Sequence, residues 1–214
     1  MVHRWTDLTF LHWSYDAATV QALLPPGIEV ETYDGLAWVG LVPFRMTVLP
    51  ASRFPETNVR TYVRGPNGRT GVWFFSLDAD NLGAVAAARA SLNLPYQCSR
   101  MRVGRSGDRV RYVSRRHLTR NAASDVAVEA GAPFAESELT DFDHWLTARF
   151  LLWTTIAGKP LYVQAHHPRW PLRRARVLRL DSRLVEAAGL PAPQGEPVVH
   201  FSDGVQVRIG LPRV

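Results

Sequence analysis

The chain has 214 residues, of which 46% are hydrophobic and 21% charged, a balance that excludes a disordered segment and provides enough apolar material for a core. The formal net charge of +6 raises nucleic acid as a partner. However, Lys159 is the only lysine, so the other 24 basic residues are arginines, which are spread along the chain without a helix-turn-helix, zinc-finger or aromatic RNA-binding pattern. We therefore predict no nucleic-acid partner.

The compartment is predicted from the cysteine content and the apolar runs. Cys98 is the only cysteine, which excludes an internal disulfide and fits a reducing compartment. We interpret it as a buried small apolar residue rather than as a nucleophile. The longest apolar runs, such as residues 36–44, are too short to span a membrane, and the first residues contain no apolar signal region. The expectation is a cytoplasmic protein with no membrane partner.

Strands dominate the elements that are predicted for the first half of the chain. A short helix over residues 17–24 can be capped by Asp16, and two prolines stop it. The Asp34-Gly35 pair predicts a hairpin turn between the strands on either side. Residues 72–75 show no polar alternation, so their strand is expected to be covered on both faces. The expected strands span residues 8–13, 28–32, 36–44, 59–63 and 71–77.

The second half of the chain adds helices to this pattern. The alanine-rich segment 84–92 predicts a helix that ends before Pro95. Apolar residues at helical spacing predict a second helix over residues 138–153, and a short third helix is expected at 182–188. Further strands are expected at residues 96–103, 109–116, 161–165, 176–180 and 198–201. The pattern predicts an α+β fold, predominantly β, around a curved antiparallel sheet or barrel, with residues 1–214 as a single domain.

Five stretches are too distinctive for generic strands and turns. They are Leu-Leu-Pro-Pro-Gly at 23–27, Phe-Pro-Glu-Thr-Asn-Val-Arg-Thr-Tyr-Val at 54–63, Gly-Val-Trp-Phe-Phe-Ser-Leu-Asp at 71–78, Ala-Arg at 88–89 with Leu-Pro-Tyr at 94–96, and His-Pro-Arg-Trp-Pro-Leu at 167–172. Together they resemble the uncharacterised bacterial DUF2071 (YqjF-like) family over essentially the whole chain. That family resembles acetoacetate decarboxylase in fold. The resemblance implies a strongly bent antiparallel sheet, like a cone-shaped barrel, that encloses a pocket, with two or three helices outside.

The sequence departs from both families at positions that matter for chemistry. The decarboxylases carry two adjacent lysines after a proline, and the first forms a Schiff base. Here Pro95 is followed by Tyr96 and Gln97, neither of which forms an imine, and Lys159 lies in a predicted turn. Where DUF2071 members usually read Thr-Glu-Arg-Tyr, this chain reads Thr-Ala-Arg-Phe at 147–150, and Arg169 separates a proline from a tryptophan. The departure from the decarboxylase pattern therefore excludes an amine-dependent decarboxylase unless Lys159 folds into the pocket.

Four large polar residues alternate along the distinctive stretch 54–63, which contains the strand predicted at 59–63. Since side chains alternate across a strand, Glu56, Asn58, Arg60 and Tyr62 point to one face. We interpret this face as the wall of a wet pocket. Two alternatives stay open, namely a Glu56–Arg60 pair that braces the sheet and a face that is exposed to solvent.

Roles in such a pocket follow from side-chain chemistry. A desolvated Glu56 is suited to acid–base catalysis, with Tyr62 and Tyr96 as further catalytic candidates. A guanidinium group offers a planar fork to a carboxylate or phosphate. The adjacent His166 and His167 face opposite ways on a strand, so no metal site is predicted. The expected substrate-binding residues are Asn58, Arg60, Arg89, Gln97, Trp73 and His12.

The combined prediction is an enzyme of unknown substrate that performs lyase, dehydratase or enolisation chemistry on an oxygenated or carboxylate-bearing compound. It needs no cofactor and no Schiff-base lysine. The alternative is a binding or sensor protein that uses the same cavity without turnover. In both cases the partner is a small anionic or carbonyl-containing molecule, and a homo-oligomer is left open.

Overall fold

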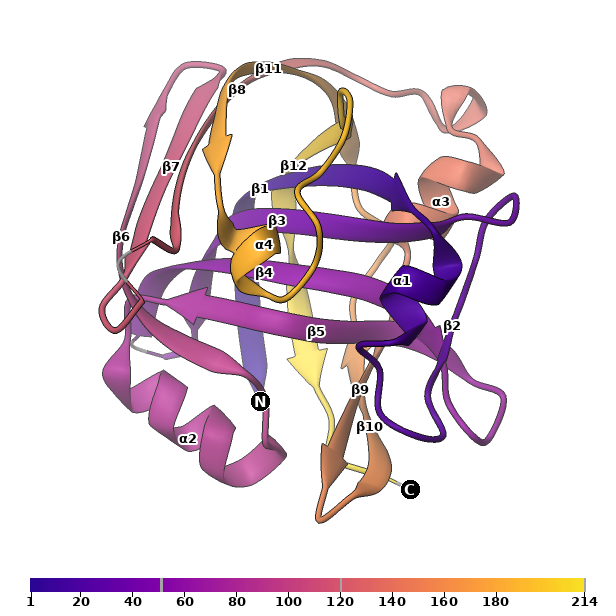
Figure 1. The fold of residues 1–214 in the computed structure, drawn as a ribbon. Helices are drawn as coiled ribbons and strands as arrows, with labels where there is room; N and C mark the ends of the chain where they lie inside the picture. The colour runs from indigo at the N-terminus through magenta and orange to yellow at the C-terminus, as the bar shows by residue number, and fades with distance from the viewer. Residues whose placement is uncertain (51, 120, 214) are drawn as a thin grey trace.

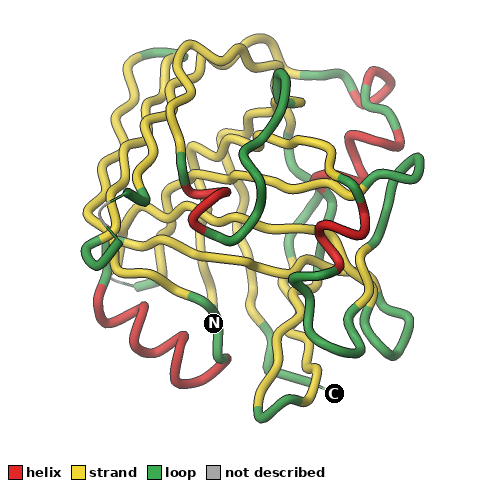
Figure 2. Tube along the Cα trace, in the orientation of Figure 1, coloured by secondary structure: helices red, strands yellow, loops and turns green. Residues whose placement is uncertain are grey.

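The computed structural model describes residues 1–50, 52–119 and 121–213, and most of them lie in strands (Figures 1 and 2). The strands of the described residues are β1 (Val2–Tyr15), β2 (Glu29–Val30), β3 (Ala37–Val48), β4 (Ser52–Arg64), β5 (Thr70–Ala79), β6 (Tyr96–Ser106), β7 (Arg109–Arg116), β8 (Ala123–Pro133), β9 (Leu151–Ile156), β10 (Lys159–His166), β11 (Leu172–Ser182) and β12 (Val198–Ile209). The helices are α1 (Ala17–Gln21), α2 (Leu82–Leu92), α3 (Asp141–Thr147) and α4 (Leu184–Ala187), with a 3-10 turn at Glu136–Glu138. None of the helices within the described residues is long and apolar enough to cross a membrane.

All described strands belong to one bent sheet that closes on itself twice. Its order is β10-β9-β5-β6-β7-β8-β11-β12-β1-β3-β4-β2, and two additional pairings, β4–β5 and β10–β12, close it. The strands β12, β1, β3, β4 and β5 therefore form a wall that both closed parts share. Most pairings are antiparallel, but β5 runs parallel to β6 and to β9. The predicted α+β, mostly β architecture with a strongly bent sheet is confirmed, and these two parallel pairings are additions to it.

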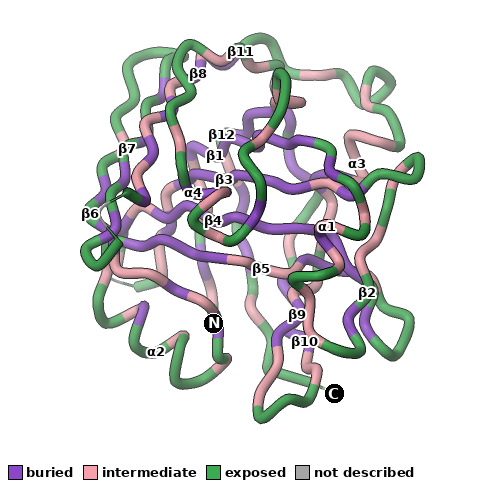
Figure 3. Tube along the Cα trace, in the orientation of Figure 1, coloured by how far each residue is buried: buried purple, intermediate pink, exposed green. Residues whose placement is uncertain are grey.

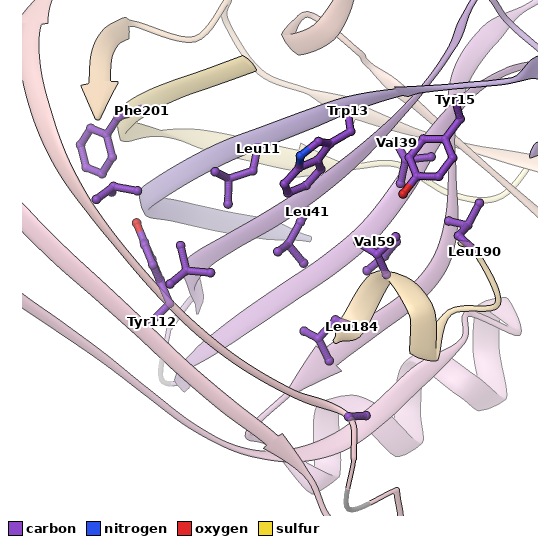
Figure 4. Close-up of a cluster of buried hydrophobic side chains, with 14 of the residues drawn as sticks. Leu11, Trp13, Tyr15, Val39, Leu41, Val59, Tyr112, Leu184, Leu190 and Phe201 are labelled. Carbon is purple, nitrogen blue, oxygen red and sulfur yellow. The ribbon is translucent and has the colours of Figure 1, made fainter. Parts of the chain in front are cut away.

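The shared wall is covered by apolar clusters on both faces. Leu11, Leu41 and Val59 lie on one face of the wall, in a cluster that β7, β8 and α4 complete (Figure 4). Leu8 and Phe44 lie on the other face, in a second cluster to which α2 and β10 contribute. Figure 3 shows buried positions running along β1, β3, β4 and β5 as a consequence. The predicted coverage of the β5 strand on both faces follows from this arrangement, because Phe74 packs in the second cluster and Phe75 in the first.

Strand β4 shows why polar residues on this wall are informative. Every residue from Glu56 to Val63 is buried. The interpretation of its polar face as exposed to solvent is therefore wrong. The ion pairs of the described residues include none between Glu56 and Arg60, which bond elsewhere, so the bracing interpretation is also not supported.

Helix α2 forms close to where it was predicted. Asn81 caps its first turn by accepting a hydrogen bond from the backbone N–H of Ala84. Asn93 ends the helix in the left-handed conformation with φ of 50°. The helix lies against the start of β6, and Arg89 in its last turn donates to the backbone carbonyl of Tyr96 through Nε at 2.7 Å.

The long helix predicted over residues 138–153 is wrong. Only Asp141–Thr147 is helical, with a capping box between Thr140 and Asp143, and the chain then enters β9 at Leu151. The apolar run of β9 contains β-branched and aromatic residues, which suit a strand that pairs with both β5 and β10. Spacing alone does not distinguish such a buried strand from a buried helix.

Two further strand expectations need correction. Strand β2 was expected to pair with β3 across the Asp34-Gly35 turn, but it pairs with β4 instead. Only one bridge, between Tyr33 and Leu36, spans that turn. Strand β8 was not predicted, because its alternation of small residues with acidic ones gives a weak apolar signal. Besides α3, three elements, α1, β2 and α4, are shorter than predicted. The other predicted elements match their expected limits or extend beyond them at one or both ends.

Candidate functional site

A cavity of about 480 Å³ lies on the face of the shared wall that carries Leu8 and Phe44, between that wall and α2. Strand β4 lines it with every second residue, which are Ser52, Phe54, Glu56, Asn58 and Arg60. Most of the remaining lining is apolar, including Leu8, Val42, Phe44, Leu77, Leu94 and Trp170. A larger hollow of about 790 Å³ over β6, β7 and β8 is more open to solvent, and its lining includes several exposed arginines together with Asp125 and Asp181. The β4 cavity is therefore the candidate site.

Glu56 and Tyr96 form a buried pair in this cavity. The Tyr96 hydroxyl donates to Oε2 of Glu56 at 2.8 Å, and both residues line the cavity. Burial raises the pKa of Glu56 to about 8, while the hydrogen bond from Tyr96 opposes the rise and the negative charge of Asp78 adds to it. Burial likewise raises the pKa of Tyr96 well above its usual value. Glu56 is thus a carboxyl group that exchanges its proton close to neutral pH, as acid–base catalysis requires.

Two guanidinium groups face the same cavity. Arg60 donates to the backbone carbonyl of Leu146 at 3.4 Å, while its Nε is buried without a partner among the described residues. Arg149 donates to Glu31 through Nη1 at 2.7 Å and to the carbonyl of Trp145 through Nε at 2.7 Å, and its Nη2 is buried without a partner in the same part of the chain. Buried donors without partners are unfavourable, which makes these two guanidinium groups the candidate anion-binding groups of the cavity.

The amide of Asn58 lies between the acid and the arginines along β4. Its Oδ1 is buried and has no partner among the described residues. Since neighbouring lining positions of β4 are two residues apart, Glu56, Asn58 and Arg60 follow each other at intervals of roughly 7 Å. The three side chains therefore form a polar strip along one wall of an otherwise apolar cavity.

Tyr62 and His12 were predicted at the site, but neither belongs to the residues that line the cavity. Helix α3 covers Tyr62, whose ring centroid lies 4.6 Å from that of Trp145. The Tyr62 hydroxyl donates to the carbonyl of Leu146 at 2.5 Å and therefore accepts from Nε2 of His12 at 2.7 Å. Burial lowers the pKa of His12 well below its usual range, so this ring is neutral. The Tyr62 ring lies beneath Arg60 and Arg149, at 5.8 and 4.9 Å from their guanidinium carbons, and supports both.

Arg89, Gln97 and Trp73 also lie outside the cavity lining. Arg89 is exposed on α2 and anchors the backbone of Tyr96, so it positions the tyrosine rather than a ligand. Gln97 follows Tyr96 on β6, and adjacent side chains of a strand point to opposite faces. For the same reason Trp73 packs against Trp153, whereas its neighbours Val72 and Phe74 line the cavity.

Arg149 was not predicted as a site residue. The sequence pattern placed it inside a helix, whereas it lies just after α3 and just before β9, beside the cavity. A signal was present in the residues that follow it, Leu-Leu-Trp-Thr-Thr-Ile, whose composition favours a strand. Lys159, the only lysine, is exposed at the start of β10, directly after the turn from β9, and is not among the cavity residues.

Comparisons with known proteins agree with the fold. Residues 2–206 match the model of the family DUF2071, described as an uncharacterized conserved protein. The uncharacterized protein YqjF of Bacillus subtilis (strain 168) is 38% identical over 212 residues, which covers 94% of this chain and 87% of YqjF.

Solved structures give the same architecture at low sequence identity. An acetoacetate decarboxylase-like enzyme from Sphingomonas wittichii RW1 aligns with a TM-score of 0.66 at 15% identity, over 99% of this chain and 91% of that chain. The enduracididine biosynthesis enzyme MppR, complexed with pyruvate, aligns with a TM-score of 0.65 at 14% identity over 99% and 89%. Acetoacetate decarboxylase from Legionella pneumophila aligns with a TM-score of 0.64 at 14% identity over 100% and 88%. At these identities the likeness shows the fold alone.

Proposed function

The chain belongs to the DUF2071 family, and from the cavity of this member we propose an enzyme that moves a proton on a small carboxylate-bearing compound without forming an imine. The observation that carries the proposal is a buried acid with its tyrosine, Glu56 and Tyr96, in the same cavity as two guanidinium groups that each hold a donor without a partner among the described residues. The reactions that fit are enolisation, dehydration and related lyase steps. MppR, which shares the fold, forms a complex with pyruvate, and this supports a carboxylate-bearing ligand for the proposal.

Binding begins at the arginines. The substrate carboxylate pairs with the guanidinium groups of Arg60 and Arg149, which both line the cavity and each hold one donor without a partner among the described residues. Because these groups are buried, their attraction for an anion is stronger than at the surface. The negative charge of Glu31 balances Arg149, while the Arg60 charge has no such carboxylate near it in the described part of the chain. The cavity therefore favours one negative charge.

Proton transfer takes place at Glu56. In its ionised form Glu56 removes a proton from the carbon next to the substrate carbonyl, and the electron pair of the broken C–H bond moves onto the carbonyl oxygen. Tyr96, which donates to Glu56, and the amide of Asn58 both line the cavity, and in this proposal they donate to that oxygen. With a pKa of about 8, roughly a tenth of Glu56 is ionised at pH 7. Glu56 then returns the proton to the same or another atom.

An assay without a known substrate can test this step. We expect the protein to catalyse deuterium exchange at the carbon next to the carbonyl of 2-oxo or 3-oxo acids in D₂O, measured by NMR. Glu56→Gln is expected to lower the exchange rate at least about hundredfold, because it removes the acid–base group, while affinity changes by less than about tenfold. The matched control is Glu196→Gln, which changes an exposed glutamate far from the cavity. Unchanged exchange in Glu56→Gln rejects the assignment.

The second candidate function, ligand binding without turnover, is favoured by the largely apolar lining of the cavity. It predicts that carboxylates bind to the wild-type protein with no exchange of carbon-bound protons for any acid in the panel. Borohydride treatment in the presence of these acids separates both candidates from imine chemistry. Neither predicts a covalent adduct, because Lys159 is exposed outside the cavity.

A further inference from the structure

The cavity is longer than a small oxo acid requires. Its lining on β4 runs from Ser52 to Arg60, which corresponds to roughly 26 Å along an extended strand. A volume of about 480 Å³ lies within the range of pockets that hold drug-sized ligands, and an acid of three or four carbons leaves most of it empty. A larger ligand would contact the part of the cavity that a small acid leaves unfilled.

The two ends of the cavity differ in chemistry. Arg60 and Arg149 lie at one end, and both side chains are buried. At the other end Ser52 and Asn81 hydrogen-bond to each other at 2.8 Å, so they satisfy one another. Between and around them the walls are apolar, with Leu8, Phe44, Leu77 and Leu94 among them. A ligand that fills the space beyond the polar strip therefore contacts mainly apolar side chains, which favours an apolar group.

Helix α2 provides this space through its small side chains. Gly83, Ala84, Ala87, Ala88 and Ser91 recur at intervals of three and four residues, so they share one helical face, and all of them line the cavity. Leucine or phenylalanine at these positions would fill the space, as large side chains do in most helix–sheet contacts. Several of the same residues are also exposed, which places an opening of the cavity beside α2.

We propose that the ligand is an amphipathic carboxylate, with its carboxylate on Arg60 and Arg149 and an apolar chain or ring that extends past Glu56 to the small-residue face of α2. The inference rests on the anion site of the proposed function and adds the substrate class. The apolar chain of the ligand lies nearest the opening beside α2. Its carboxylate is desolvated at the end of the cavity where Arg60 and Arg149 lie. Glu56, four residues before Arg60 on β4, then faces a carbon within the chain rather than its terminus.

The test uses unreactive saturated acids and the Glu56→Gln variant, so that binding is measured apart from chemistry. Acetate, butanoate, hexanoate and decanoate are titrated by calorimetry. Affinity is expected to rise about threefold to fourfold for each methylene that enters the apolar part. Decanol is expected to bind at least about tenfold more weakly than decanoate, because it lacks the charge that Arg60 recognises.

Variants of α2 locate the chain. Ala88→Leu is expected to weaken decanoate binding at least about tenfold and to change butanoate binding by less than about twofold, because leucine fills the apolar end only. Ala86→Leu is the matched control, since Ala86 lies on the exposed side of the helix and does not line the cavity. Ala84→Val adds less volume and serves if Ala88→Leu does not fold, which a thermal melt reports.

The outcomes separate this inference from the proposed function. Affinity that does not depend on chain length, or equal losses for butanoate and decanoate in Ala88→Leu, overturns the amphipathic ligand. Chain-length dependence without deuterium exchange in the wild-type protein leaves the inference standing and rejects the proton-transfer enzyme. Deuterium exchange without chain-length dependence rejects the amphipathic ligand and leaves the proton-transfer enzyme standing.

Discussion

The Glu56→Gln substitution is expected to make the stability of the protein less dependent on pH. Burial raises the pKa of Glu56 from 4.5 to about 8 in the folded protein, whereas the unfolded chain keeps the ordinary value. Below pH 4.5 both states hold the proton and the effect vanishes. Between pH 4.5 and 8 the unfolded chain releases the proton while the folded protein keeps it, so the free energy of unfolding falls as pH rises. Above pH 8 the loss is complete.

The size of the effect follows from the shift in pKa. One pKa unit corresponds to about 1.4 kcal/mol, so the shift from 4.5 to about 8 destabilises the wild-type protein by about 5 kcal/mol above pH 8, and by about 3 kcal/mol at pH 7. Glutamine has nearly the same shape as the protonated acid and can still accept the hydrogen bond from Tyr96. The variant is therefore expected to match the wild type near pH 4.5 and to exceed it increasingly toward pH 8.

Urea unfolding at several pH values measures this difference. The free energy of unfolding of Glu56→Gln minus that of the wild type is expected to grow by about 3 kcal/mol between pH 4.5 and 7. The control Glu196→Gln, at an exposed position, is expected to show a flat difference over the same range. A flat difference for Glu56→Gln as well would refute the reasoning, because it would mean that Glu56 releases its proton at an ordinary pH.

Three other predictions concern the frame of the site. In the wild type, Arg116 donates to both carboxylate oxygens of Asp78, at 2.8 and 2.9 Å, and this ion pair is buried. Asp78→Asn breaks the pair and is expected to lower the free energy of unfolding by about 3–5 kcal/mol. A loss below about 1 kcal/mol in urea unfolding would contradict this expectation. Gly204→Ala places a Cβ 2.0 Å from a backbone oxygen of β1 at a φ of +126°, so thermal melts should show a clear loss of at least about 1–3 kcal/mol, whereas Gly104→Ala, which has open space, should change stability by less than about 0.5 kcal/mol. Lys159→Arg should leave the rate of deuterium exchange unchanged, because Lys159 does not line the cavity. A reduced rate in this variant would mean that the Lys159 amine takes part in the reaction.

The part of the site on β4 could be predicted from the sequence because strand alternation is strictly local. Glu56, Asn58 and Arg60 share a face for any extended backbone, and large polar residues on a strand within an apolar chain indicate a buried cavity. The same rule placed Tyr62 on that face, where it does point. Its exclusion from the cavity depends on α3, which packs Trp145 over the ring, and this contact between distant segments has no local signal.

The parts that escaped prediction depend on pairing between distant segments. The apolar run 151–156 forms β9 because β5 and β10 flank it, and a helix would have satisfied the same spacing. Arg149 reaches the cavity only because the chain turns from α3 into that strand. The role of α2 as a cavity wall was hidden for a different reason. Its alanines predict a helix well, but alanine does not indicate whether a helical face covers a core or an open space.

A crystal structure of the protein soaked with a 2-oxo acid that carries an apolar chain tests the central claim most directly. We predict density for the carboxylate within hydrogen-bonding distance of Arg60 and Arg149, with the carbonyl beside Glu56 and Tyr96 and the chain against α2. Density for the acid elsewhere on the surface, or a cavity that holds only ordered water at saturating ligand, would contradict the account.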